Sequence, residues 1–273
     1  MEPNRLVKRR LVYHFFISDD YETNEIYKIH FACLEYFAKI FDEAVFIITS
    51  NNENVPYLDV ESKLLKIFKN TRITIEIKTN TALCEAETFY NEVVKKEESV
   101  LTFFFHTKGI TNIKDCSKEN IISWILMIYY YSLNFQEDME KYLLFQPYGI
   151  FYGSCKGIIK TTNRTLNENS TIYMGCGYWI NNIRLANEKR NIPQMADRWY
   201  GEMMPYYFEE KNKYSYNNVY IQNHNFYDGN NDKKVVDIFE WYNEDGVKKF
   251  CEFKEKILNL SEKYKQSNEN RDI

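Results

Sequence analysis

The sequence contains few glycines and prolines, which are common in flexible chains, and it lacks the motifs of common ligand sites. It has only 9 glycines and 5 prolines but 23 tyrosines and 19 phenylalanines, a balance that excludes a disordered chain and implies large packed surfaces. Its four histidines are spread along the chain and form no metal-binding motif. Six cysteines occur without a Cys-x-x-Cys pair, which indicates reduced thiols in a cytosolic protein rather than a disulfide framework or a zinc site.

Long apolar runs are also missing. No run reaches the roughly 18–20 residues that cross a bilayer, and the N-terminus lacks the apolar region of a signal peptide. We therefore expect a soluble, cytoplasmic protein without a transmembrane segment. The basic residues near the start, Arg5, Lys8, Arg9 and Arg10, are interpreted as a solvated lead-in to the first strand or as a contact for an acidic partner or a membrane.

Signatures of nucleotide-dependent and hydrolytic enzymes are absent too. The sequence has no Gly-x-Gly-x-x-Gly after its first apolar strand, no P-loop and no Gly-x-Ser-x-Gly elbow. A formal net charge of −4 and a pI near 5.7 argue against a general nucleic-acid binder, whose footprint is usually basic. At 273 residues the chain is long enough to bury about three quarters of its unfolded surface in one large α/β domain.

The first half of the chain alternates strand and helix patterns. Apolar runs predict strands over 11–17, 44–49, 73–77 and 100–105, and helical periodicity predicts helices over 24–41, 60–69 and 85–96. This alternation indicates βαβ units and therefore an α/β fold with a mostly parallel central sheet flanked by helices. Further along we expect one long helix over 118–144, a strand over 148–153, a loop over 211–231 and a closing helix over 233–264.

The strand over 100–105 ends abruptly in polar residues. His106, Thr107 and Lys108 follow the apolar run, and Gly109 allows the chain to turn. Ligands of open α/β sheets bind just beyond the carboxyl ends of such strands. The pattern fits either a binding site or an ordinary solvated strand end.

Two later segments carry further candidate residues. Gly175 and Gly177 allow a backbone to approach a ligand closely, and Trp179 is placed either to stack on a sugar or to be buried. Arg198 and Glu202 stand four residues apart, a spacing that suits a helical salt bridge as well as a catalytic carboxylate.

The order of these segments resembles a group of small GT-A-type glycosyltransferases that includes bacterial capsule-type and viral members. The resemblance rests on a strand ending in Phe-His-Thr-Lys-Gly, a following Trp-containing helix, a Gly-Cys-Gly-Tyr-Trp segment and the pair Arg198 and Glu202, in that order over about residues 11–205. It implies a single GT-A-like catalytic domain over 1–273. Residues 11–110 would form a Rossmann-like half that binds the nucleotide sugar, 111–232 the acceptor and catalytic half, and 233–273 a C-terminal helix and tail.

The resemblance also implies an activity and its residues. The expected reaction moves a sugar from a nucleoside-diphosphate donor, a UDP-sugar, to a glycan hydroxyl, with inversion favoured and retention left open. Glu202 is the expected catalytic base. The expected donor-binding residues are His14, Phe15, His106, Thr107, Lys108 and Gly109, and the expected acceptor-binding residues are Gly175, Gly177, Trp179 and Arg198.

The sequence departs from this family at one point. GT-A enzymes usually carry an Asp-x-Asp that holds a metal ion on the donor diphosphate, and here His106, Thr107 and Lys108 occupy that strand end. Lys108 could supply the positive charge instead. A Mn²⁺ or Mg²⁺ cofactor therefore stays open, with His224 and Asp228 as candidate ligands. The rival hypothesis is a non-catalytic glycan- or protein-binding module on the same scaffold.

Overall fold

The fold is given by a computed structural model that describes most of the chain. The described residues are 7–107, 110, 118–154, 156–158, 171–173, 177–188, 192, 194–195, 200–215 and 244–264. No helix among them is long and apolar enough to cross a membrane.

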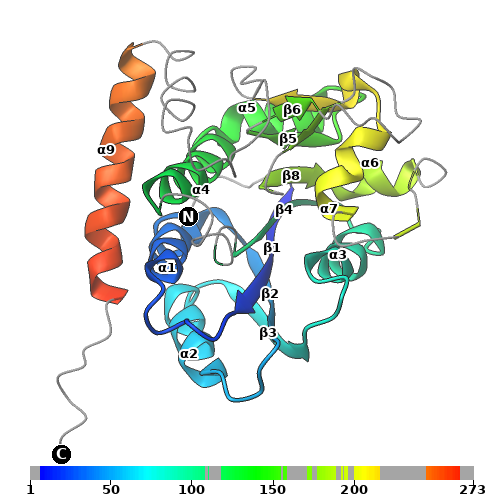
Figure 1. The fold of residues 1–273 in the computed structure, drawn as a ribbon. Helices are drawn as coiled ribbons and strands as arrows, with labels where there is room; N and C mark the ends of the chain where they lie inside the picture. Colours follow the sequence, from blue (N-terminus) through cyan, green and yellow to red (C-terminus); the bar gives the residue numbers. More distant parts are fainter. Residues whose placement is uncertain are drawn as a thin grey trace, which may run out of the picture.

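A seven-stranded mixed sheet, in the order β3-β2-β1-β4-β8-β5-β9, organises the molecule (Figure 1). Its strands are β1 Lys8–Ile17, β2 Glu43–Ser50, β3 Arg72–Thr79, β4 Val100–His106, β5 Phe151–Gly153, β8 Tyr178–Asn181 and β9 Lys213–Ser215. The first four strands are mutually parallel, and β8 alone runs antiparallel to its neighbours β4 and β5. The predicted α/β fold with a mostly parallel sheet is confirmed. The strands β6 Lys156–Ile158 and β7 Thr171–Tyr173 pair separately.

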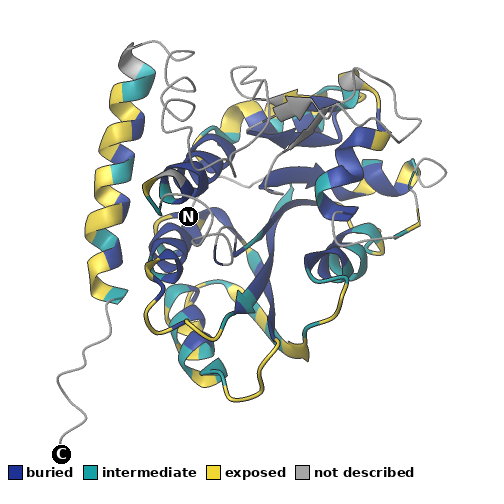
Figure 2. Cartoon of the chain, viewed as in Figure 1, coloured by how far each residue is buried: buried dark blue, intermediate teal, exposed yellow. Residues whose placement is uncertain are grey.

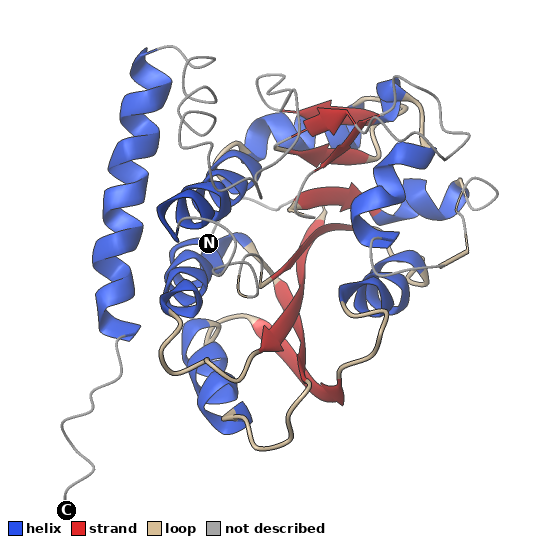
Figure 3. Ribbon diagram, in the orientation of Figure 1, coloured by secondary structure: helices blue, strands red, loops and turns tan. Residues whose placement is uncertain are grey.

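Helices cover both faces of this sheet (Figure 3). On one side lie α1 Glu25–Phe37, α2 Tyr57–Ile67, α4 Lys118–Leu133 and α9 Glu244–Ser261, and on the other lie α3 Glu85–Phe89, α6 Asn182–Asn187 and α7 Tyr200–Met203. Each face has its own apolar cluster, because alternate residues of every strand point to opposite sides. The sheet is continuous from β4 to β8, so strands from both expected halves of the domain share it.

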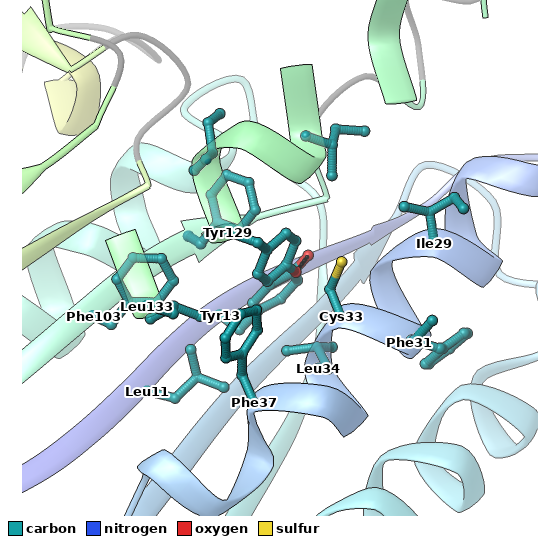
Figure 4. Packing of buried hydrophobic residues seen from close by; sticks show 14 of the residues in the cluster. Leu11, Tyr13, Ile29, Phe31, Cys33, Leu34, Phe37, Phe103, Tyr129 and Leu133 are labelled. Carbon is teal, nitrogen blue, oxygen red and sulfur yellow. Dashed lines mark hydrogen bonds between the residues drawn. The ribbon is translucent and has the colours of Figure 1, made fainter. Parts of the chain in front are cut away.

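The core beneath α1 and α4 is aromatic and contains a small buried polar group (Figure 4). The Tyr13 hydroxyl lies 2.8 Å from Nδ1 of His30 and 3.2 Å from the Tyr129 hydroxyl. All three residues are buried, and each finds a hydrogen-bond partner among the others. Asn24 fixes the start of α1, because its side chain accepts a hydrogen bond from the Ile26 backbone N–H at 3.1 Å.

Three predicted elements differ from the structure. The single helix expected over 118–144 is wrong, because α4 ends at Leu133 and α5 Gln136–Glu140 begins a new helical segment. The strand expected over 148–153 begins only at Phe151. The loop expected over 211–231 contains β9, whose pairing with β5 comes from a part of the chain about sixty residues away. The closing helix is described as α9 and a short 3₁₀ turn Glu262–Tyr264, and its expected start at 233 lies outside the described residues.

Two of the four basic N-terminal residues, Arg9 and Arg10, are not a solvated lead-in, and Arg5 lies outside the described residues. Arg9 donates two hydrogen bonds to the Glu140 carboxylate, and Arg10 pairs with the carboxylate of Glu92 at 3.0 Å. Both arginines are buried. These ion pairs therefore hold the start of β1 to α5 on one face of the sheet and to the helical segment after α3 on the other. The two guanidinium groups do not face an acidic partner.

Candidate functional site

The parallel pairing of β1 and β4 places two histidines side by side near the carboxyl edge of the sheet. His14 and His106 are partners in the ladder, so both side chains project from the same face, the one that α3 covers. His14 is buried and His106 is partly exposed. Of the candidates derived from the sequence, these two are brought together.

Thr107 closes the end of β4 against β1. Its backbone N–H donates to the His14 carbonyl at 3.1 Å, and its hydroxyl accepts from the Phe16 N–H at 2.9 Å. The hydroxyl also lies 3.3 Å from the Phe16 carbonyl, to which it donates. Thr107 therefore extends the pairing of the two strands. Its hydroxyl is hydrogen-bonded to the backbone of Phe16 and does not face a bound nucleotide sugar.

The imidazole of His14 bridges the sheet and the helix above it. Its Nδ1 lies 2.9 Å from the Thr88 hydroxyl on α3, and its Nε2 lies 3.1 Å from the Thr49 hydroxyl on β2. Burial lowers the pKa of His14 to about 3, so the ring is neutral at pH 7. A neutral imidazole donates through one nitrogen and accepts through the other, which suits both hydroxyl partners.

A pocket of about 50 Å³ lies beside this imidazole, between α3 and the carboxyl ends of β2 and β3. Its wall includes the three polar groups just described together with Asn80 and Cys84. The backbone of Cys84 has φ of 47°, which turns the chain sharply from the loop after β3 into α3. The enclosed volume holds a few waters and is much smaller than the roughly 300 Å³ or more of a typical ligand pocket.

Three residues that line this pocket, Thr49, Asn80 and Thr88, were not predicted as site residues. A signal was present for the first two, since each follows the apolar part of a strand at the carboxyl edge, as His106 does. Thr88 carried none, because its role depends on contact with His14, 74 residues earlier.

Glu202 lies on α7, which packs on the same face of the sheet. The backbone next to it passes close over β4, since a Cβ at Gly201 would lie 3.3 Å from Cε1 of Phe104. The hydroxyl of Tyr178 also donates to the Gly201 carbonyl at 2.5 Å. Phe104 precedes His106 by two residues on the same face, so α7 packs on the face from which the two histidines project. Glu202 itself is partly exposed.

Three predicted site residues are core residues instead. Trp179 is fully buried, stacks 5.7 Å from the Phe41 ring and donates from its indole to the Ser132 carbonyl. Gly177 lets β8 approach helix α4, since a Cβ there would lie 1.9 Å from Cγ2 of Ile128. Phe15 is fully buried against α1. None of the three presents a surface to an acceptor or a nucleotide.

The remaining candidates lie outside the described residues. They are Lys108, Gly109, Gly175, Arg198, His224 and Asp228. Within the part of the chain that the structure describes, no cluster of three or more His, Cys, Asp or Glu side chains could hold a metal ion.

No protein-family model matches the chain, and no curated protein matches it.

The buried, neutral state of His14 predicts an acid-sensitive fold. As the pH falls, the unfolded chain takes up this proton near pH 6.5, whereas the folded chain does so only near pH 3. Stability should therefore fall by about 2 kcal/mol between pH 7.5 and pH 5 through this group alone. Urea unfolding at the two pH values measures the loss, and it should shrink by that amount in a His14→Gln variant. An equal loss in both proteins would contradict the assignment.

Proposed function

We propose that the protein is a glycosyltransferase that moves a sugar from a UDP-sugar to a hydroxyl of a glycan, with inversion. The observation that carries the proposal is the cluster at the carboxyl edge of the sheet. There, His14 and His106 project side by side, a polar pocket opens beside His14, and α7 brings Glu202 onto the same face. This edge is where open α/β sheets bind their ligands.

The polar pocket suits the uncharged part of a nucleotide. Its hydroxyls and the Asn80 amide can donate and accept hydrogen bonds, and the carboxylates of Glu87 and Glu92 can accept them, as recognition of a base or a ribose requires. Because the enclosed volume is small, the rest of the donor would lie over the ends of β1 and β4. Lys108 follows Thr107 directly in the sequence and is the residue we assign to the diphosphate.

The chemistry needs a base and a stabilised leaving group. Glu202 is assigned to deprotonate the acceptor hydroxyl, and Lys108 is assigned to the charge that develops on the departing diphosphate. The strand end lacks Asp-x-Asp, which is why Lys108 is assigned to the diphosphate; a Mn²⁺ or Mg²⁺ ion held by His224 and Asp228 stays open as a cofactor. The proposal places the reaction in the cytoplasm, with residues 11–110 holding the donor and 111–232 the acceptor.

Donor binding tests this function. Thermal unfolding of the protein should be shifted upward by a UDP-sugar but not by GDP- or CMP-sugars, each tried with and without Mn²⁺. Lys108→Ala should abolish the shift and the turnover of donor while the protein stays folded. Lys39→Ala, which removes an exposed lysine of the 3₁₀ turn after α1, is the matched control and should keep both.

Other outcomes have defined meanings. Stabilisation by a different nucleotide sugar would keep the activity class and change the donor. No response to any nucleotide sugar would overturn the proposal and favour the glycan- or protein-binding module. Full donor turnover in Lys108→Ala would remove this lysine from the mechanism.

A further inference from the structure

The strand β3 forms one border of the sheet and pairs on one side only. All eight of its residues, Arg72–Thr79, are in register with β2 without a bulge. On its other side no strand pairs with it among the described residues. Figure 2 shows this border of the sheet more exposed than the dark blue central strands, and Ile77 is 48% exposed.

Such a border presents a row of open backbone groups to any strand that can pair with it. Soluble proteins usually protect these borders with proline, bulges, very short strands or charged side chains. β3 has no proline and no bulge, and its sequence Arg-Ile-Thr-Ile-Glu-Ile-Lys-Thr is longer than an average strand and rich in β-branched residues. Its charged residues carry both signs, so each can face an opposite charge on an added strand. The open border is therefore a surface suited to adding another strand.

We propose that two copies of the chain pair antiparallel through β3, about a two-fold axis at Thr74, so that their sheets become one continuous sheet. A two-fold axis perpendicular to the sheet makes the contact self-complementary. It places Arg72 opposite Glu76 of the partner subunit, and the symmetry repeats this ion pair. On the other face it places Ile73 opposite Ile75 of the partner subunit, which also occurs twice.

Charge selects this register over its neighbours. An axis at Ile75 would set Arg72 opposite Lys78 of the partner subunit, and an axis at Glu76 would set Glu76 opposite the partner's Glu76. Like charges directly opposite each other are destabilising. An axis at Ile77 would pair Glu76 with Lys78 of the partner subunit but gives one opposed isoleucine pair instead of two. The axis at Thr74 combines two arginine–carboxylate pairs with two isoleucine pairs.

Helix α2 adds apolar surface to the same contact. It packs on the face of β3 that carries Ile73 and Ile75. Leu58 and Leu65, two turns apart on this helix, are 78% and 47% exposed. The two-fold axis brings α2 of both copies onto the same face of the joined sheet. This supplies area that a single pair of strands lacks, since stable interfaces bury about 1,000 Å² or more.

The test is the mass of the full-length protein in solution, measured by light scattering and sedimentation over a range of concentrations. The wild type should be a dimer. Arg72→Glu and Glu76→Arg should each raise the dimer dissociation constant by at least about tenfold, because each sets like charges opposite each other. The double variant R72E/E76R restores opposite charges and should return the dissociation constant close to that of the wild type.

Lys141→Glu is the control, since it reverses the charge of an exposed lysine in the helical segment Lys141–Phe145, at the end of the sheet away from β3. It should leave the dissociation constant unchanged. A monomeric wild type would overturn the proposal, and so would a double variant no tighter than the single ones. An unchanged dissociation constant in both R72E and E76R would overturn the register at Thr74. Circular dichroism of each variant confirms that the chain is folded.

Discussion

Replacing Trp179 with alanine is expected to lower the free energy of unfolding by about 3–5 kcal/mol. The indole is fully buried between the rings of Phe41 and Phe103, at 5.7 Å and 5.5 Å between centroids. It also donates from Nε1 to the Ser132 carbonyl at 2.7 Å. Truncation removes the apolar contacts, opens a cavity and leaves that buried carbonyl without its donor. Urea unfolding followed by far-UV circular dichroism measures the loss.

Two further variants serve as comparisons for Trp179→Ala. Trp179→Phe keeps much of the ring volume but not the hydrogen bond, so it should cost clearly less than the alanine variant. Phe145→Ala removes an aromatic ring that is 67% exposed and should cost less than about 1 kcal/mol. If Trp179→Ala lowered the free energy of unfolding as little as Phe145→Ala does, the indole would not be a core residue. Its predicted contact with an acceptor sugar would then be open again.

The first half of the fold could be predicted because its signals are local. Apolar runs such as 11–17 and 100–105 identify buried strands by themselves, and the alternation of strands with helices favours parallel pairing of neighbouring strands. The position of His106 at a carboxyl edge follows from the same pattern. That His14 lies beside it does not, because the register of β1 against β4 is set by the packing of the whole sheet.

The second half depends on partners far apart in the sequence. Gly177 carries the local signature of a close backbone approach, but the sequence does not say what approaches, and the structure shows Ile128 of helix α4. Arg9 and Arg10 are exposed by any local criterion, yet carboxylates more than eighty residues away bury them in ion pairs. Strand β9 is too short and polar to be recognised without β5 beside it.

The residues of the candidate site were likewise predictable only where their signal is local. Residues at strand ends could be found from sequence, whereas Thr88 and the pocket beside α3 exist only through tertiary contact. A tryptophan or a glycine that packs the core looks the same in the sequence as one that contacts a ligand. The structure shows that Trp179 and Gly177 are of the first kind. Of the expected acceptor-binding residues, Gly175 and Arg198 stay predictions. Glu202, the expected catalytic base, lies on α7, which packs on the face from which the two histidines project.

Under the proposed function, Glu202→Gln should lower the rate of sugar transfer by about 10²–10⁴-fold while the protein still binds the donor. The amide keeps the shape and the hydrogen-bonding capacity of the side chain but cannot take up the acceptor proton. Transfer is followed by release of the nucleoside diphosphate in the presence of acceptor, and donor binding is followed by the thermal shift.

A second carboxylate on the same segment makes the comparison specific. Glu209 is exposed and pairs with Lys211 at 2.6 Å, so Glu209→Gln removes a nearby negative charge without touching α7 and should leave transfer unchanged. Unchanged transfer in Glu202→Gln would remove this residue from the mechanism. Loss of donor binding together with transfer would make Glu202 part of the donor site or of the packing of α7. Loss of transfer alone is the result that a catalytic base requires, because only the step that needs a proton acceptor would then have failed.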